Sequence, residues 1–297
     1  MDNSVAFIIN GGRKSTVKKS KELIEYLKTK DFKYIVKFTE YKQHAVTLTK
    51  ELIALGYKTI VACGGDGTVN EVTNGIVSSG EEVALSIIPL GRGNDTHWGF
   101  DLEKDLKKAV DKLAFPKTKK IDLVLYKDIS RYFINICGIG LEAHINETAS
   151  QMKHIQGFLS YALGFVKILI NNIKPYDVDL TIDDKTVASK AQVIALCNGR
   201  REGGAFLLAP EAVNDDGYLD LVYTNGYFKN FSLLSLAISF FSGKHTNGKA
   251  VTCTKCKTLK VVSKKPEMII EVDGELCNTS SLACTFEIKE KILSLVI

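Results

Sequence analysis

The sequence predicts an α/β protein in two parts, a parallel α/β domain over residues 1–125 and a β-rich domain over residues 126–297. In the first part, short apolar runs alternate with helix-like patterns, which is typical of a parallel sheet with helices on its faces. From residue 121 onward, β-branched and alternating runs occur in hairpin-like pairs, which favours antiparallel strands. The length of 297 residues accommodates two domains of this kind.

The first part contains four short runs that are typical of buried strands. They are Val5–Ile9, Tyr34–Phe38, Thr59–Cys63 and Val83–Ile88. Three helices are expected between them. The first runs from a cap at Ser15 or Thr16 towards Thr29, the second passes through Leu52–Leu55 and stops at Gly56, and the third lies near Val69–Val77.

The second part contains five runs with strand character and two helical stretches. The expected strands are Asp179–Ile182 and Val187–Leu196, on either side of a turn at Asp183-Asp184, then Leu219–Tyr223, Leu259–Val262 and Met268–Val272. The helical stretches lie near residues 142–172 and 227–242. Mostly antiparallel strands with few helices predict a β-rich domain.

Composition narrows the possible function classes. A net charge of +5 is too mild to predict a nucleic-acid partner, and seven cysteines, an odd number, argue against a disulfide framework. Met1–Ser4 shows no feature of a secretory signal, so a cytoplasmic protein is expected. No apolar run reaches the ~20 residues that span a bilayer. The two most apolar stretches, Gly157–Ile170 and Phe231–Phe241, fit buried or interfacial helices better.

The strongest motif is a glycine-rich string, Gly64-Gly65-Asp66-Gly67-Thr68, that follows a predicted strand and opens a predicted helix. Glycines let backbone N–H groups approach a phosphate closely, and the start of a helix favours negative charge. Asp66 would repel a phosphate unless a cation screens it, so it implies Mg²⁺ or a proton-accepting role. The alternative interpretation is a tight strand-to-helix turn.

A second glycine-rich loop, Pro89-Leu90-Gly91-Arg92-Gly93-Asn94-Asp95, follows the fourth predicted strand. Since the carboxyl ends of parallel strands meet at one edge of a sheet, both loops are expected on the same edge. Arg92 could reach a phosphate there, and Asn94 or Asp95 could simply cap the next helix. The sequence has neither a Gly-x4-Gly-Lys-Ser/Thr phosphate loop nor the His-Arg-Asp string of protein kinases.

Taken together, these strings resemble the diacylglycerol kinase catalytic-domain family, and most of all its soluble bacterial lipid kinases. The resemblance rests on the two loops together with Asn70-Glu71. It continues in Asn198 with Gly203-Gly204, Ala209-Pro210-Glu211-Ala212, Asp216-Gly217-Tyr218-Leu219-Asp220 and Asp273-Gly274-Glu275, which cover nearly the whole chain in order. The first string alone is shared with NAD kinases and some phosphofructokinases.

The resemblance implies a Rossmann-like N-terminal domain, a C-terminal antiparallel β-sandwich domain, an active cleft, ATP as phosphate donor and Mg²⁺. It implies that the end of the chain packs back on the first domain. The expected nucleotide-binding residues are Asn10, Thr39, Gly64, Gly65, Asp66, Gly67, Thr68, Val69, Asn70, Glu71, Gly91, Arg92, Gly93 and Asn94. Glu275 matches the proton acceptor of the family and acts in catalysis with Asp66. Asp216, with the carbonyls of Val213 and Tyr218, matches a structural magnesium site.

The expected partners are a lipid substrate, the surface of a membrane that the protein visits transiently, and a second copy in a homodimer, with no nucleic acid. The two apolar stretches named above are candidates for the lipid path, or for core helices. The lipid itself stays open among diacylglycerol, a sphingoid base, a monoacylglycerol and a polyprenol-like alcohol. Two other functions stay open as well, an NAD kinase-like phosphorylation of a soluble dinucleotide and a non-catalytic nucleotide-binding regulator.

Overall fold

The computed structural model describes residues 4–151, 163–164, 166–167, 173–204, 206–277 and 280–297. The chain divides into two compact units. Unit 1 comprises Met1–Asp122 and Lys291–Ile297, and unit 2 comprises Leu123–Glu290. Two strands, β5 (Thr118–Tyr126) and β18 (Ala283–Val296), run from one unit into the other.

Unit 1 is built on the parallel sheet that the alternating pattern predicts. Its strands are β1 (Val5–Ile9), β2 (Tyr34–Phe38), β3 (Thr59–Gly64) and β4 (Ala84–Pro89), in the order β2-β1-β3-β4. The last residues of β18 add a parallel neighbour to β4, with Ser294 opposite Ala84. All five side chains of β1 are buried, as expected of a strand covered on both faces.

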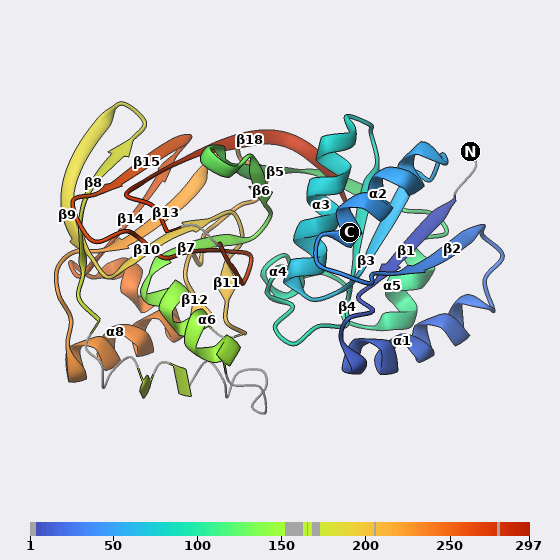
Figure 1. The fold of residues 1–297 in the computed structure, drawn as a ribbon, viewed down its shortest axis with the longest axis horizontal. Coiled ribbons are helices and arrows are strands. Elements are labelled where there is room, and N and C mark those ends of the chain that lie inside the picture. The colour runs from blue at the N-terminus through green and yellow to red at the C-terminus, as the bar shows by residue number, and fades with distance from the viewer. Residues whose placement is uncertain (1–3, 152–162, 165, 168–172, 205, 278–279) are drawn as a thin grey trace. The chain divides into compact units, whose positions relative to one another are not determined.

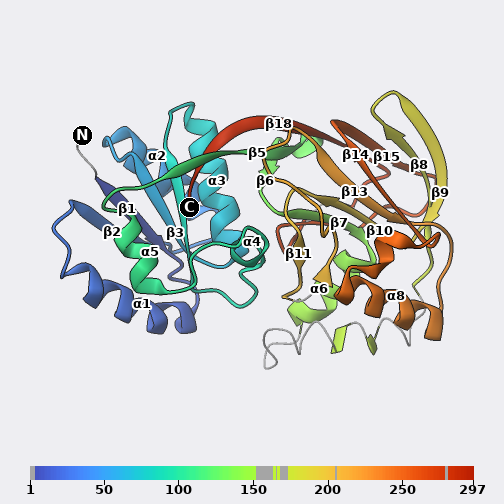
Figure 2. The same ribbon diagram turned by 180° about the vertical axis from the view of Figure 1, so that it is seen from behind.

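Helices cover both faces of this sheet (Figures 1 and 2). They are α1 (Lys14–Leu27), α2 (His44–Ala54), α3 (Asp66–Ser79), α4 (Asp95–Gly99) and α5 (Leu106–Lys112). Helix α2 packs on α3, and α1 packs on α5. Gly75 permits the first of these contacts, because a Cβ atom there would lie 2.6 Å from the Thr49 Cβ. Helix α1 begins at Lys14, before the predicted caps Ser15 and Thr16.

Unit 2 is a sandwich of two antiparallel sheets. In one, β15 (Thr258–Ser263) lies between β18 and β8 (Tyr176–Ile182), and β9 (Lys185–Ala191) pairs with β8. The other has the order β14-β13-β10-β7-β16-β17. Its strands are β14 (Val251–Cys256), β13 (Leu219–Thr224), β10 (Val193–Cys197), β7 (Ile136–Gly140), β16 (Ile270–Val272) and β17 (Glu275–Leu276). Both fold classes, α/β and β-sandwich, agree with the prediction.

The short elements complete unit 2. They are β6 (Arg131–Phe133), β11 (Arg201–Glu202), β12 (Phe206–Leu207), and the 3₁₀ turns η1 (Lys127–Ile129) and η2 (Lys244–Asn247). A large apolar core, which includes Ile194, Leu221 and Phe286, fills the space between the sheets. Alternate residues such as Val193, Ala195 and Val222 belong to a second core, on the other face of the β10 sheet.

Two helices, α6 (Leu141–Gln151) and α8 (Asn230–Ser242), contribute to this second core (Figure 2). They overlap the two helical stretches that the sequence predicts, and α6 begins one residue earlier than expected. The remainder of the first stretch, including most of Gly157–Ile170, lies outside the described residues. Helix α8 starts after Lys229, whose backbone N–H donates to the Ser232 hydroxyl at 2.8 Å. In the described part of the chain, no helix is both long and apolar enough to cross a membrane.

The expected single strand Val187–Leu196 is wrong, because the structure breaks it at Gln192 into β9 and β10, which belong to different sheets. The Gln192 side chain is buried and bonded to three backbone groups outside the strands. It donates to the carbonyls of Ile173 and Phe228 and accepts from the N–H of Phe228. The turn to the second sheet is therefore stabilised by a polar side chain in the middle of the stretch predicted as one strand.

Candidate functional site

The two glycine-rich loops of unit 1 contact each other directly. The Gly64 carbonyl oxygen accepts hydrogen bonds from the N–H groups of Leu90 at 2.9 Å and Gly91 at 2.8 Å. A Cβ atom at Gly91 would overlap the α carbon of Gly65, so this approach requires glycine. The loops therefore form one backbone surface at the carboxyl edge of β3 and β4, where ligands of parallel sheets bind.

Helix α3 begins at this surface. Its N-cap is Gly65, and no side chain among the described residues caps it. The backbone N–H groups and the positive end of the helix dipole therefore stay available to an anion at the first turn. Gly67 lies in that turn, while Val69 and Asn70 are buried behind it. The start of α3 is thus suited to hold a phosphate with its backbone.

Asp66 links the first loop to the second. One of its carboxylate oxygens accepts the Thr96 N–H, in the first turn of α4, at 2.9 Å. The other oxygen lies beside Gly93, where a Cβ atom would be 3.3 Å from it and 2.9 Å from a carboxylate oxygen of Asp95. Two carboxylates thus lie beside a residue without a side chain. Carboxylate oxygens of this kind are the ligands that Mg²⁺ prefers.

The ends of β1 and β2 lie next to the first loop. The Asn10 side-chain amide donates to the Thr68 hydroxyl at 3.2 Å, and the Gly11 N–H donates to the Thr39 hydroxyl at 3.2 Å. Asn94 adopts a left-handed conformation, with φ at 59°, and its side-chain oxygen accepts the Gly91 N–H at 2.9 Å. Thus Asn94 shapes the second loop, and Arg92 is exposed at its tip.

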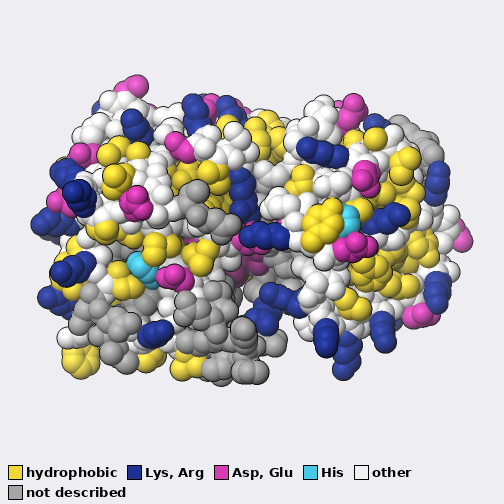
Figure 3. Space-filling view, viewed as in Figure 1, with side chains coloured by type: hydrophobic (Ala, Val, Ile, Leu, Met, Phe, Trp, Pro, Cys, Tyr) yellow, Lys and Arg dark blue, Asp and Glu magenta, His cyan; other side chains and the backbone are white. Residues whose placement is uncertain are grey.

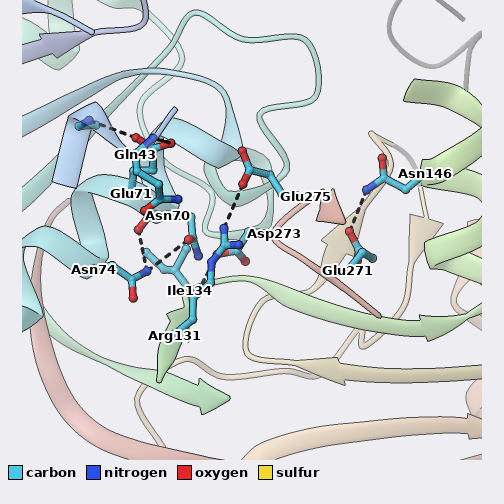
Figure 4. A network of polar contacts seen from close by, with 11 residues as sticks. Gln43, Asn70, Glu71, Asn74, Arg131, Ile134, Asn146, Glu271, Asp273 and Glu275 are labelled. Atoms are coloured by element: carbon cyan, nitrogen blue, oxygen red, sulfur yellow. Dashed lines mark hydrogen bonds and ion pairs between the residues drawn. The ribbon is translucent and has the colours of Figure 1, made fainter. Parts of the chain in front are cut away.

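Glu71 has a positioning role that the sequence did not predict. Its carboxylate is buried and accepts the backbone N–H of Gln43 at 2.9 Å and of Ala45 at 3.1 Å (Figure 4). It therefore holds the first turn of α2, whose N-cap Gln43 has a left-handed φ of 67°. The side chain of Asn74 donates to the carbonyl of Asn70 at 2.8 Å, within α3. Both predicted nucleotide residues, Asn70 and Glu71, thus bond to the protein itself.

Glu275, in unit 2, lies at the start of β17, directly after a two-residue hairpin turn. Asp273 and Gly274 both have positive φ, 47° and 77°, as an Asp-Gly turn between two strands requires. The Glu275 carboxylate accepts from the Arg131 guanidinium at 3.2 Å (Figure 4), and both side chains are only partly exposed. Arg131 was not predicted, because a single arginine far away in sequence gives no local signal.

Asp273 fixes this hairpin against the rest of the sheet. Its buried carboxylate accepts three backbone N–H groups, from Ile134 at 3.1 Å, Asn135 at 2.9 Å and Ile136 at 3.3 Å. Three hydrogen bonds to one ionised group give a rigid turn. The position of Glu275 is therefore determined by its neighbour in sequence as well as by Arg131.

At Asp216, a lysine already supplies positive charge. The Asp216 carboxylate accepts the Tyr218 N–H at 3.0 Å with one oxygen and bonds to the Lys255 ammonium with the other. This contact raises the pKa of Lys255. Val213 and Tyr218, the predicted carbonyl donors, have exposed side chains. The described residues contain no group of three or more His, Cys, Asp or Glu suited to a metal. As arranged here, the donors fit an ammonium better than Mg²⁺.

On the face drawn in Figure 3, Lys and Arg side chains are scattered among acidic and apolar ones in both units. Many of the lysines pair with a nearby acid, such as Lys30 with Asp111 and Lys120 with Glu82. Such exposed pairs contribute little to stability, so they are typical of a solvated surface.

Two family models match the chain. The one described as "Diacylglycerol kinase catalytic domain" matches residues 4–126, and the one described as "YegS C-terminal NAD kinase beta sandwich-like domain" matches residues 135–297. A protein named diacylglycerol kinase from Staphylococcus saprophyticus is 32% identical over 240 residues, which is 80% of this chain and 76% of that protein. A protein named "Probable lipid kinase YegS-like" from Klebsiella pneumoniae is 31% identical over 218 residues, 73% of this chain and 72% of that protein.

Solved structures share the fold. A crystal structure described as that of a diacylglycerol kinase from Bacillus anthracis str. Sterne matches with a TM-score of 0.72 and 19% identity. The match covers 99% of this chain and 96% of that chain. It confirms the predicted α/β and β-sandwich architecture.

Proposed function

Because the chain belongs to the diacylglycerol kinase family, we propose that it transfers the terminal phosphate of ATP to a hydroxyl group of a lipid, with diacylglycerol as the first candidate. The observation that carries this proposal is the pair of interlocked glycine loops at the uncapped start of α3. Phosphoryl transfer depends mainly on positioned phosphates and on groups that stabilise their charge. The relatives with lipid-kinase names support a lipid acceptor.

The nucleotide phosphates would lie on the backbone of Gly64–Thr68, with Gly91–Gly93 beside them. Asn10 and Thr39 would form the border of the site at the ends of β1 and β2, since they hydrogen-bond to Thr68 and Gly11. Arg92, exposed at the tip of the second loop, would contact a phosphate with its guanidinium, which matches phosphate geometry. Asn94 and Glu71 would act indirectly, by fixing the loops that make these contacts.

Mg²⁺ fits the carboxylates of Asp66 and Asp95, because both lie beside Gly93, which offers no side chain to fill the space. When bound, the ion neutralises charge on the phosphates. Asp66 also keeps the second loop in place through the Thr96 N–H. Because an uncharged amide oxygen can still accept that N–H, removal of the Asp66 charge should affect metal binding more than the fold.

Glu275 would accept the proton of the lipid hydroxyl. Arg131 orients its carboxylate through an ion pair at 3.2 Å. The Asp273 turn, with three backbone hydrogen bonds, limits movement of the hairpin. A carboxylate held in this way can meet a hydroxyl in a defined direction, which general-base catalysis requires.

Helix α8 would rest on the cytoplasmic surface of a membrane. Its inner residues Leu233, Leu236 and Phe240 are buried, whereas the outer ones include Phe231, 88% exposed, and Ile238, 58% exposed. A helix that is apolar on its exposed face as well suits the interface of a lipid bilayer. Lys229, Lys244 and Lys249 flank the helix and would contact anionic headgroups, at about 1 kcal/mol each.

The test is phosphate transfer from labelled ATP to dioleoylglycerol in vesicles or mixed micelles, with NAD⁺ as a soluble alternative acceptor. The proposal expects a labelled lipid, formed only when Mg²⁺ is present, and no labelled dinucleotide. A labelled dinucleotide would instead indicate the NAD kinase-like function. Tight binding of Mg-ATP without transfer to any lipid of a total extract would indicate a regulator.

A further inference from the structure

Unit 2 contains an apolar cavity under helix α8. It is open on one side and lined mainly by apolar side chains. Helix α6, strand β10, the β11–β12 hairpin and α8 line it. Its lining residues are Leu141, Glu142, Ile145, Asn146, Val193, Glu202, Gly203, Phe206, Leu208, Leu233, Leu236, Ala237 and Phe240. Such a lining, apolar with a few polar groups, is typical of a site for an apolar ligand.

One end of the cavity is polar. Both carboxyl oxygens of Glu142 are buried, and no group in the described part of the chain hydrogen-bonds to them. The space around them depends on Gly138 of β7, where a Cβ atom would lie 2.6 Å from Glu142 Oε2 and 2.9 Å from Glu271 Oε1. A buried carboxyl without a partner is costly, so its retention beside a cavity indicates a ligand that completes it.

The surroundings of Glu142 favour its uncharged form. Burial raises the pKa of Glu142 well above its usual value, and the nearby Glu271 carboxyl raises it further. The cavity lining includes no lysine, arginine or histidine among the described residues. Glu271 already accepts the Asn146 amide at 3.0 Å (Figure 4), so that amide does not compensate Glu142. A neutral carboxylic acid carries one O–H donor, which can bind an ester or hydroxyl oxygen.

We propose that this cavity receives one acyl chain of a neutral acylglycerol and that Glu142 donates a hydrogen bond to an oxygen of its glycerol ester. This deepens the proposed function and rests on it. The apolar lining excludes water from the chain, and the carboxyl marks where the polar headgroup begins. The cavity disfavours a free fatty acid, because its negative charge would lie beside the buried carboxyl groups of Glu142 and Glu271. It also disfavours an amine-bearing lipid, because the ammonium group would need Glu142 to ionise and burial opposes this.

The polar end of the cavity lies near the hairpin that carries Glu275, the proposed proton acceptor. Glu271, behind Glu142, lies in β16, opposite Leu276 of β17, and Val272 lies opposite Glu275. Glu271, beside Glu142, and Glu275 therefore lie on the same hairpin, whose turn Asp273 holds. On the outer side, the exposed face of α8 would contact the membrane from which the chain arrives.

Filling the cavity tests the site for the chain. Ala237→Phe places a ring in the cavity, and Val187→Phe, at an exposed position of β9 outside the cavity lining, is the matched control. We expect Ala237→Phe to lower kcat/KM for dioleoylglycerol by at least ~10-fold, as loss of a hydrophobic subsite does. Turnover of soluble dihexanoylglycerol, ATP affinity and Tm should stay close to wild type. Equal kcat/KM values for dioleoylglycerol in Ala237→Phe and Val187→Phe would overturn the proposal. If Ala237→Phe lowers Tm, the smaller Ala237→Val carries the same comparison.

Two substitutions at Glu142 test the donor. Glu142→Gln keeps a donor and no charge, so the KM for dioleoylglycerol should change little. Glu142→Leu removes the donor, and KM should rise by about 10-fold, the usual effect of one lost hydrogen bond to a buried group. Sphingosine, whose amine needs an ionised partner, should be a poor substrate of the wild type. Efficient sphingosine turnover that Glu142→Gln abolishes would overturn the role of Glu142 as a neutral donor.

Binding without turnover separates this inference from the proposed function. The probe is a fluorescent monoacylglycerol, titrated into the full-length protein without ATP. If the protein phosphorylates no lipid but Ala237→Phe abolishes probe binding, the function fails and the cavity assignment stands. If wild type phosphorylates dioleoylglycerol while Ala237→Phe binds the probe equally well, the function stands and the cavity assignment fails.

Discussion

Glu71→Gln distinguishes a nucleotide contact from a positioning role. In the structure, the Glu71 side chain is only 8% exposed and accepts two backbone N–H groups at the start of α2. Glutamine has nearly the same shape, but its NH₂ group would face one of those donors. One charge-assisted hydrogen bond is lost, worth about 1.5–3 kcal/mol, and the attraction of the helix dipole for a carboxylate, about 0.3–1 kcal/mol, is lost as well.

We therefore expect the free energy of unfolding to fall by about 2–4 kcal/mol, with a drop in Tm of roughly 5–15 °C. The loop that carries Thr39 would loosen, so the KM for ATP should rise while kcat at saturating ATP changes less. Tm by differential scanning fluorimetry and initial rates against ATP concentration give both quantities. Glu51→Gln, on the exposed side of α2, is the control for charge alone. An unchanged Tm with a raised KM would refute this reasoning and indicate that Glu71 contacts the nucleotide.

Four further perturbations have defined outcomes. Asp66→Asn should keep Tm, because its side-chain oxygen still accepts the Thr96 N–H, yet lower kcat by about 10²–10³; near-normal turnover would exclude a role in holding Mg²⁺. Glu275→Gln should lower kcat by ~10²–10⁴ at unchanged ATP affinity, and loss of ATP binding with normal kcat would contradict this. In Lys255→Met, Tm should rise with Mg²⁺ concentration, because the ion can replace the ammonium at the Asp216 carboxylate, whereas the Tm of wild type should change little. Equal changes in Tm would show that Lys255 does not compete with Mg²⁺ for Asp216. Burial raises the pKa of Asp220 to about 6, so its ionisation costs folding stability as pH rises from about 4 to 6. The free energy of unfolding of Asp220→Asn should therefore exceed that of wild type by up to about 3 kcal/mol at pH 7 and should equal it at pH 4. The same difference in urea titrations at both pH values would refute the raised pKa.

The sequence by itself determined the features that local chemistry decides. The four strands of the parallel sheet, with the helices between them, follow from short apolar runs and helical spacing, which depend on neighbours in sequence. The turn at Asp273-Gly274 is a local property too, because that dipeptide tolerates the two positive φ values of a tight hairpin. Both glycine loops were recognisable for the same reason, since their residue types permit backbone conformations that few others allow.

Only the tertiary structure decided which distant groups meet. The polar contacts of Gln192 divide the stretch that the sequence predicts as one strand, because its hydrogen-bond partners, Ile173 and Phe228, are distant in sequence. Arg131 meets Glu275 across 144 positions of sequence, and Glu142 meets Glu271 above Gly138. Such pairs depend on strand register, where a shift of one residue turns every side chain to the opposite face. The glycine loops can therefore be predicted from local sequence, whereas the partners of the carboxylates depend on how the sheets are assembled.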